Sequence, residues 1–313
     1  MTELGLALSS EDHPPNELVR QAALAERAGF TFCLISDHYH PWVDAQGQSP
    51  FVWSTLGGIA NATERIRVGT GVTCPLVRQH PGLVAQAAAT VAAMMPGRFF
   101  LGVGTGENLN EHVFGARWPL PDERLEMLEE AVAVMRLLWQ GGEQTHRGRH
   151  YTVDHARVYT LPDEPIEVYV AASKPNAAEL AAKIGDGLIS TAPDEDVVKS
   201  FGKKAPRIGM MHCAYDRNAK AGLRRATQLW PNLALKGPLG QELATPSDFE
   251  EAAAMVEEED VAESTPHGPD PQPYLDAIGE YADAGFTHVY IHQIGDNQDE
   301  FAEFAARELM PKL

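Results

Sequence analysis

The sequence predicts an α/β fold of the (β/α)8 type, a TIM barrel in which helices surround a closed ring of parallel strands. Three observations lead to this prediction. Short apolar runs alternate with amphipathic stretches about eight times along the 313 residues. The first strand-like run leads into Ser9-Ser10-Glu11-Asp12-His13, without the glycine fingerprint of an open, doubly wound sheet. Polar and glycine-rich segments follow successive strand-like runs, where a barrel collects its active-site residues.

The first half of the chain predicts four strand–helix pairs. One helix has Leu18, Ala22 and Ala25 at helical spacing and stops at Gly29, a residue typical of helix ends. Another, over residues 122–139, shows a long apolar stripe at the same spacing. The expected strands are residues 4–8, 30–35, 66–72 and 99–103, and the expected helices are residues 15–28, 50–62, 81–95 and 122–139.

The second half continues the alternation. Strands that alternate with helices of this length pair in parallel through right-handed crossovers, and eight such units favour a closed barrel over an open sheet. The expected strands are residues 166–171, 187–190, 207–215 and 287–292, and the expected helices are residues 175–183, 220–230, 273–284 and 299–308.

Two segments fall outside the alternation. Residues 145–165 are expected to form a small hairpin. Residues 230–271 are rich in proline, glycine and acidic residues, and we expect them to carry a lid-like helix over residues 249–262. The chain 1–313 is therefore expected to be one domain with an insertion at about residues 231–271.

Composition excludes several classes of protein. Hydrophobic residues make up 44% and charged residues 22%, which excludes a disordered or fibrous chain. The net charge of −19 argues against a nucleic-acid partner and against binding to an anionic membrane. The cysteines Cys33, Cys74 and Cys213 are far apart, so we expect neither a disulfide framework nor a zinc site. We see no signal peptide or membrane span and expect a cytoplasmic protein with a small-molecule substrate.

Side chains that could carry chemistry follow the second and fourth strands. Ser36-Asp37-His38 and Trp42 come after the second strand. A histidine beside a carboxylate is a candidate general base, although the pair could equally be incidental to a solvated loop. A glycine-rich run with Glu107 follows the fourth strand. It indicates either an acid that faces a ligand or an acidic helix start.

Glycines and a helix start follow the third and fifth strands. Residues 69–75 form either a turn that ends at Pro75 or a backbone that a flat ligand can approach closely. Residues 172–176 open a helix in which Ser173 can serve as the cap and Pro175 suits the first turn. The free N–H groups of that turn could bind an anion, or the segment could be a plain helix cap. Thr191 follows the sixth strand and adds a hydroxyl.

Other conspicuous residues are interpreted as structural. The acidic run over residues 257–260 reads as a solvated helix face. The histidines of the hairpin share no helical spacing, so we expect no metal site there. The tryptophans on apolar faces are Trp53, Trp118 and Trp139, and the hairpin histidines are His146, His150 and His155.

Several of these stretches resemble the luciferase-like flavin and deazaflavin enzymes. They are Ser36-Asp37-His38 with Pro41-Trp42, residues 69–75, residues 100–111 (FLGVGTGENLNE) and Gly185-Asp186-Gly187. The chain looks most similar to the branch of deazaflavin-dependent glucose-6-phosphate dehydrogenases and their relatives. The resemblance extends over nearly the whole chain and is most specific between residues 36 and 111. It implies a (β/α)8 barrel, usually a homodimer, with 8-hydroxy-5-deazaflavin (coenzyme F420) as its cofactor.

The resemblance also implies a role for each matching residue. His38 would take the proton of the substrate hydroxyl, Trp42 would stabilise the reacting group, and Glu107 would protonate the N1 side of the deazaflavin. Gly71 and Val72 would form a cis peptide behind the ring. The residues implied in cofactor binding are Asp37, Gly71, Val72, Cys74, Gly106, Asn110, Ala172, Ser173, Pro175 and Thr191.

The sequence departs from that branch where the sugar phosphate would be held. Asp194-Glu195 stand where the family has a lysine, and Ala262-Glu263-Ser264 occupy the position of an arginine. Lys236 is the candidate for the remaining lysine. An unpaired phosphate buried beside Asp194 would be unfavourable. We therefore expect a neutral alcohol or an unphosphorylated sugar-like substrate.

Two other functions remain open at this stage. One is a luciferase-like monooxygenase that uses flavin mononucleotide (FMN). The other is a non-catalytic deazaflavin-binding protein, which would bind the cofactor and lose nothing when His38 is changed to alanine. The combination of His38, Trp42 and Glu107 favours the hydride-transfer enzyme, since an oxygenase needs no acid that faces N1.

Overall fold

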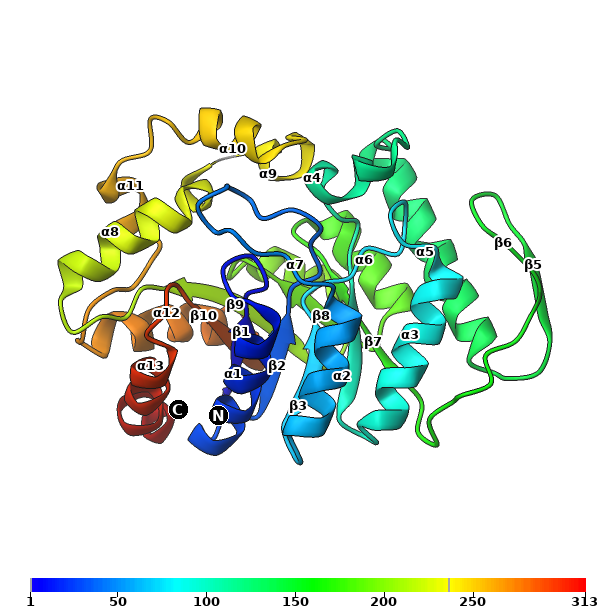
Figure 1. The fold of residues 1–313 in the computed structure, drawn as a ribbon, viewed down its shortest axis with the longest axis horizontal. Coiled ribbons are helices and arrows are strands. Elements are labelled where there is room, and N and C mark those ends of the chain that lie inside the picture. Colours follow the sequence, from blue (N-terminus) through cyan, green and yellow to red (C-terminus); the bar gives the residue numbers. More distant parts are fainter. Residues whose placement is uncertain (1, 236) are drawn as a thin grey trace.

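The computed structural model describes residues 2–235 and 237–313. Within these residues eight parallel strands close into a barrel, in the order β1, β10, β9, β8, β7, β4, β3, β2. The predicted (β/α)8 fold is therefore confirmed, and Figure 1 shows helices around the ring. The strands are β1 (Glu3–Leu8), β2 (Phe32–Ile35), β3 (Arg67–Thr70), β4 (Phe99–Val103), β7 (Glu167–Ala171), β8 (Gly187–Ser190), β9 (Arg207–Cys213) and β10 (His288–Gln293).

The helices of the barrel lie close to their predicted positions. Helix α1 begins at Pro15 and ends before Gly29, whose φ of 100° and N–H bond to Ala25 terminate it. Its buried stripe includes Leu18, Ala22 and Ala25, as the spacing predicted. The barrel helices are α1 (Pro15–Ala28), α2 (Val52–Ala62), α3 (Pro81–Met94), α5 (Pro121–Leu138), α6 (Pro175–Ile184), α8 (Ala219–Leu229), α12 (Gln272–Asp283) and α13 (Gln298–Phe304).

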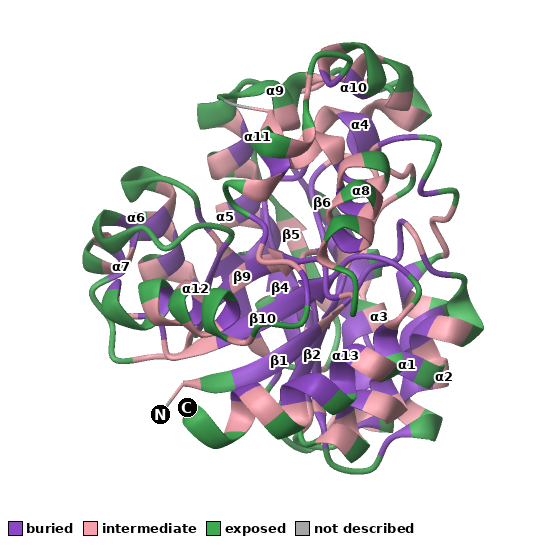
Figure 2. Ribbon diagram, turned by 90° about the vertical axis from the view of Figure 1, so that its left-hand side faces the viewer, coloured by how far each residue is buried: buried purple, intermediate pink, exposed green. Residues whose placement is uncertain are grey.

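The barrel interior is filled by side chains that point inward at every second strand position. Figure 2 shows the strands buried among their helices. Large rings need small neighbours in this layer, since a Cβ at Gly69 would overlap the ring of Phe100. The inward-facing cluster consists of Phe32, Leu34, Phe100, Tyr169, Ile189, Ile208 and Tyr290. A larger cluster lies between the strands and the helices.

The excursions from the barrel are partly as predicted. The hairpin is confirmed as the antiparallel pair β5 (Gln144–Arg147) and β6 (Thr152–Ala156). The single helix expected over residues 249–262 is wrong, because the structure has two short helices, α10 (Pro246–Ala252) and α11 (Glu258–Ala262). Each begins with its own capping box, Thr245 with Asp248 and Glu257 with Asp260. The first helix therefore ends and a new helix starts within the segment.

Three further short helices were not predicted, α4 (Asn108–Glu111), α7 (Glu195–Phe201) and α9 (Leu239–Glu242). Helix α7 follows β8 and is capped by the Asp194 carboxylate, which accepts from the N–H groups of Asp196 and Val197. Helix α4 follows β4 and packs against α9 of the insertion. Figure 1 shows α4, α9 and α10 together at one end of the barrel. No helix in the described part of the chain is long and apolar enough to cross a membrane.

Replacing Phe100 by alanine is expected to lower the free energy of unfolding by about 3–5 kcal/mol, because it leaves a cavity in the centre of the barrel. The matched control is Phe114→Ala, since Phe114 is 69% exposed whereas Phe100 is 1% exposed. This second change should alter the free energy of unfolding by less than about 0.5 kcal/mol. Urea unfolding followed by tryptophan fluorescence measures both, and equal losses would contradict the interior position of Phe100.

Candidate active site

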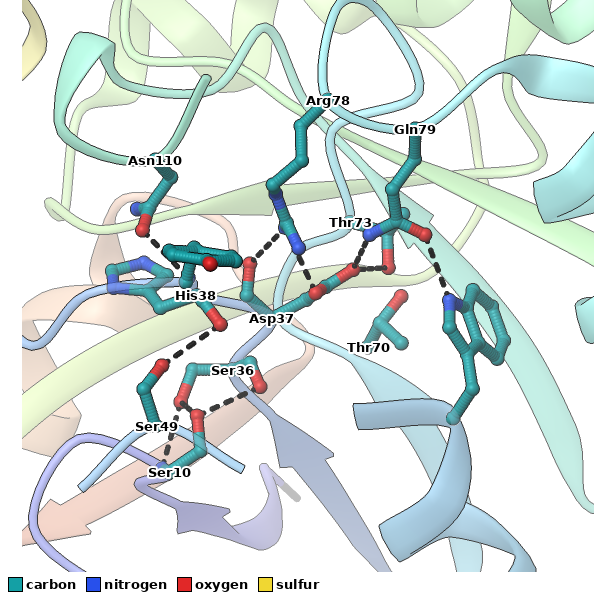
Figure 3. Close-up of polar contacts among 12 residues, drawn as sticks. Ser10, Ser36, Asp37, His38, Ser49, Thr70, Thr73, Arg78, Gln79 and Asn110 are labelled. Atoms are coloured by element: carbon teal, nitrogen blue, oxygen red, sulfur yellow. Dashed lines mark hydrogen bonds and ion pairs between the residues drawn. The ribbon is translucent and has the colours of Figure 1, made fainter. Parts of the chain in front are cut away.

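The candidate active site lies at the carboxyl ends of the barrel strands, where segments that are distant in sequence meet. Residues after β1, β2, β3 and β4 contribute to one network of polar contacts, part of which is drawn in Figure 3. Parallel strands bring their carboxyl ends to the same rim, so the segments predicted from the strand exits converge there.

His38 lies between two carboxylates. Its Nδ1 is 3.1 Å from Oε1 of Glu11, at an angle that departs from a straight hydrogen bond. Its Nε2 is 4.0 Å from Oε2 of Glu107. The imidazole side chain is 11% exposed, whereas the Glu11 side chain is 3% exposed. One nitrogen of the ring therefore lies beside a buried carboxylate, and the other nitrogen is directed toward the more accessible carboxyl group of Glu107, whose side chain is 28% exposed.

Glu11 is held by two hydroxyls. Its Oε2 accepts from Ser9 Oγ and from Ser36 Oγ, both at 2.8 Å. Ser36 Oγ also lies 2.7 Å from Ser10 Oγ, so the ends of β1 and β2 are joined. The sequence analysis missed Glu11 as a site residue. The available signal was an acidic residue three positions after the end of the first strand, at the rim where a partner for His38 would have to lie.

Trp42 links the histidine to the insertion. Its ring meets His38 edge-on at a centroid distance of 5.0 Å and meets Phe249 of α10 at 5.1 Å. The backbone N–H of Trp42 donates to Gln46 Oε1 at 2.7 Å, and this bond holds the loop in place. The insertion therefore packs directly on the side chain that covers the candidate base.

Asp37 is buried in a set of protein contacts. Its Oδ1 accepts from Arg78 at 2.9 Å, and its Oδ2 accepts from Thr73 Oγ1 at 2.8 Å and from Gln79 Nε2 at 2.7 Å. Arg78 also pairs with Glu111 at 3.5 Å. Burial raises the pKa of the Glu111 carboxyl. Since the Asp37 side chain is only 1% exposed, its carboxylate serves mainly to hold these segments together.

The side-chain amide of Asn110 has an N–H donor that no described residue uses. Its Oδ1 accepts from the backbone N–H groups of Tyr39 at 2.8 Å and His40 at 3.1 Å. Its Nδ2 is buried and has no hydrogen-bond partner among the described residues. A buried amide nitrogen without a partner is unfavourable, so this N–H group is suited to a ligand carbonyl.

The glycine segment after β3 faces this rim. The peptide bond between Gly71 and Val72 is cis, as the resemblance implies. Val72 packs against the barrel interior, and Cys74 is buried. A Cβ on Gly106 would collide with the Cys74 sulfur, so the loops after β3 and β4 are in close contact.

The remaining predicted contacts gather at the ends of β7 and β8, which are paired strands. Ala172 is buried, whereas Ser173, Pro175 and Thr191 are exposed. The expectation that Ser173 caps the next helix is wrong, because Lys174 is the N-cap of α6 and provides no side-chain cap. The first N–H groups of α6 therefore have no capping side chain and are available to an anionic group.

Other histidines and tryptophans have structural roles. Within the described residues no group of three His, Cys, Asp or Glu side chains could hold a metal. Trp118 stacks on Arg124 at 4.3 Å, and Trp53 and Trp139 pack against the core. The hairpin histidines contact glutamates, in the pairs His146 with Glu130, His150 with Glu126 and His155 with Glu143.

The segments that the resemblance relates to phosphate binding have structural roles in this chain. Asp194 caps α7, and Glu263 follows the last turn of α11. Lys236 lies outside the described residues. Arg78 is paired with carboxylates, as are Arg124 and Arg225. Within the described part of the chain, these three arginines are therefore already neutralised by the protein.

Comparison with known proteins agrees with this geometry. The sequence profile of the family described as luciferase-like monooxygenase matches residues 1–288. The chain is 36% identical over 329 residues to the F420-dependent glucose-6-phosphate dehydrogenase of Beutenbergia cavernae, covering 100% of this chain and 98% of that protein. It is also 36% identical to the enzyme of the same name from Intrasporangium calvum, covering 100% and 99%.

Solved structures extend the comparison. An F420-dependent secondary alcohol dehydrogenase in complex with an F420-acetone adduct superposes with a TM-score of 0.90 at 27% identity, covering 98% of both chains. The F420-dependent tetrahydromethanopterin reductase of Methanopyrus kandleri is 22% identical with a TM-score of 0.80, covering 99% of both chains. At this lower sequence identity, the similarity to the reductase shows a common fold.

Arg78→Met is expected to lower the free energy of unfolding by about 3–5 kcal/mol at about pH 8, because it leaves two buried carboxylates without their cation. The pKa of Glu111 is already raised by burial, so this group binds its proton more tightly in the folded than in the unfolded state. The loss should therefore shrink as the pH falls toward about 5 and the carboxyl is protonated.

Urea unfolding at the two pH values measures this effect. The matched control is Arg147→Met, because the Arg147–Asp154 pair is exposed and should contribute less than about 1 kcal/mol. A loss that is equal for both variants, or that grows as the pH falls, would contradict the role given to Arg78.

Proposed function

The chain belongs to the luciferase-like family, and on that premise we propose that it is an F420-dependent oxidoreductase. It transfers a hydride between the CH–OH group of an alcohol or sugar-type substrate and C5 of the deazaflavin. The observation that carries the proposal is the position of His38 between Glu11 and Glu107. Oxidation of an alcohol releases a proton with the hydride, and this arrangement provides a base for that proton and an acid on the opposite side.

The residues present fit the deazaflavin. Asn110 offers a buried N–H group that has no partner among the described residues. The uncapped start of α6, near Ser173 and Thr191, suits the anionic tail of the cofactor. When bound, F420 accepts or returns the hydride at C5. The backbone of Gly71 and Val72 and the neighbouring Cys74 and Gly106 complete the binding surface.

The residues of the chain handle the proton. Nε2 of His38 takes the proton of the substrate hydroxyl, because Nδ1 is turned toward Glu11. The Glu11 carboxylate then stabilises the positive charge on the ring, and Ser9 and Ser36 keep that carboxylate in place. Glu107, whose Oε2 lies 4.0 Å from Nε2 of His38, is the acid that we assign to the cofactor side. Trp42 packs edge-on against His38 and limits access of water to it.

The substrate that we propose is uncharged. Glu11 places negative charge beside His38, and Arg78 is already shared between Asp37 and Glu111. The curated relatives act on glucose 6-phosphate, as their names say. In this chain Asp194 caps α7 at the position where that branch has a lysine. A neutral alcohol or sugar-like molecule suits this electrostatic environment better than a phosphate ester.

We also propose a homodimer built on α2 and α3. A groove of about 230 Å³ between these helices is lined by apolar groups that include Trp53, Leu83 and Met94. Leu83 is 54% and Met94 is 42% exposed, so a second copy could bury them in a two-fold contact. The family resemblance makes a second copy the expected occupant.

Light scattering tests the dimer. The wild type should have about twice the mass of one chain, and Leu83→Glu should shift it toward the monomer because a charge enters the apolar contact. Leu120→Glu is the control, since Leu120 is 73% exposed and lies outside the groove. A monomeric wild type would show that the dimer proposal is wrong.

Titration of the purified protein with oxidised F420 and, separately, with FMN tests the proposed reaction. Fluorescence should report tight binding of F420 and weak binding of FMN. A screen of neutral alcohols should then bleach the absorbance of oxidised F420. Preference for FMN would instead indicate a monooxygenase of the same family.

His38→Ala should lower turnover about 10²–10⁴-fold and leave the affinity for F420 nearly unchanged, because the general base is lost while the cofactor contacts remain. The same fluorescence titration provides the affinity. His146→Ala is the matched control, since His146 lies in the hairpin and contacts Glu130. Unchanged turnover in His38→Ala would favour a protein that binds deazaflavin without catalysis.

A further inference from the structure

A half-buried and a buried histidine form a pair that the reaction described above does not use. His212 on β9 and His292 on β10 are partners in the parallel register of these strands. Their Nδ1 atoms are 2.8 Å apart, and their rings meet edge-on at 5.1 Å. A contact this short between two nitrogens requires that one ring donates and the other accepts.

The strand periodicity places this pair on the floor of the active site. Met210 and Tyr290 face the barrel interior, and His212 and His292 are the next inward-facing residues on the same strands. The same two-residue step leads from Leu34 of the interior cluster to Ser36, which holds Glu11. The histidine pair therefore belongs to the layer that carries the catalytic network.

Aromatic contacts connect the pair to the candidate base. The ring of Trp230 lies 4.4 Å from His292 and 6.0 Å from His212. Its Nε1 donates to Asp12 Oδ2 at 3.3 Å, and Asp12 follows Glu11 in the chain. Trp42, which covers His38, packs against the same cluster as Trp230. The pair and the base thus lie at the same end of the barrel, where we place the candidate substrate pocket.

The two rings differ in their access to that pocket. His292 is 3% exposed, and its Nε2 is buried without a partner among the described residues. His212 is half-buried, and within the same residues its only hydrogen bond is through Nδ1. Its Nε2 is therefore the polar atom that the pair can offer to a molecule in the pocket.

The pair is electrically neutral. Burial lowers the pKa of both imidazoles, so each ring carries a single proton at neutral pH. If His212 accepts at Nδ1, its Nε2 donates into the pocket, and if it donates at Nδ1, its Nε2 accepts. In either case the group that meets the substrate is uncharged. Such a group suits a hydroxyl or a carbonyl and gives no charge compensation to a phosphate.

We propose that His212 is a specificity-determining residue whose Nε2 hydrogen-bonds a second, uncharged oxygen of the substrate, held in place by His292. The substrate class is then a neutral alcohol with a neighbouring hydroxyl or carbonyl group. This inference rests on the proposed hydride-transfer function. In the reaction the C–H bond of the carbinol carbon breaks with its electron pair passing to F420, and the O–H proton passes to His38. The second oxygen stays unchanged and only binds.

A matched pair of alcohols tests the inference. With bound F420, the wild type should have a kcat/KM for propane-1,2-diol that is about tenfold or more above that for propan-2-ol, because the diol satisfies His212. His212→Phe should bring this ratio close to one, mainly by raising KM for the diol. His212→Gln keeps a hydrogen-bonding group and should restore part of the ratio. His146→Phe, in the hairpin, should leave both values unchanged.

A second measurement separates failure of the inference from failure of the proposed function. The ¹⁵N resonance of His212 Nε2, assigned by its loss in His212→Phe, should shift when propane-1,2-diol is added to the F420-bound protein. If either alcohol is oxidised, the ratio of the two kcat/KM values tests the inference. Equal ratios in the wild type and His212→Phe overturn the inference, while the proposed function stands. If neither is oxidised, the proposed function fails for these alcohols, and the ¹⁵N shift alone decides whether His212 binds the diol.

Discussion

The arrangement of the active site depends on Arg78, which is buried between the carboxylates of Asp37 and Glu111. These residues come from the segments after β3, β2 and β4, so one guanidinium ties three loops together. Buried charges persist only when they are paired, which leaves these loops little freedom to move. Since His38 follows Asp37 and Asn110 precedes Glu111, the same ion pairs fix the positions of the candidate base and of a donor for the cofactor.

The second constraint is the layering of the barrel. Aromatic and aliphatic side chains fill the interior, and the next inward position on each strand begins the polar floor. Ser36 and Ser9, which follow β2 and β1 directly, hold Glu11 there, and Glu11 lies beside Nδ1 of His38. The carboxylate that faces the candidate base is therefore positioned by residues at the ends of rigid strands.

The sequence predicted what depends on local signals and missed what depends on closure of the barrel. Helix α1 and strand β4 were located to the residue, because a proline, a glycine and uninterrupted apolar runs mark their ends. The prediction of one helix over residues 249–262 was wrong. The acidic amphipathic pattern of these residues is easier to recognise than the two capping boxes that divide the segment into separate helices. His212 and His292 become neighbours when β9 pairs with β10, and Glu11 meets His38 when β1 pairs with β2. Those pairings connect residues that no spacing rule relates.

Because of these constraints, the two halves of the chain contribute different kinds of side chain to the candidate site. The first four strands carry the proposed base, its carboxylate and the proposed acid on short segments, as proton transfer requires tight geometry. The last strands and the insertion carry Trp230, the histidine pair and Phe249, which lie around the proposed substrate position. Loops and insertions can vary without disturbing a barrel, so in the proposed reaction the choice of substrate can depend on the second half of the chain while the proton-handling residues stay in the first half.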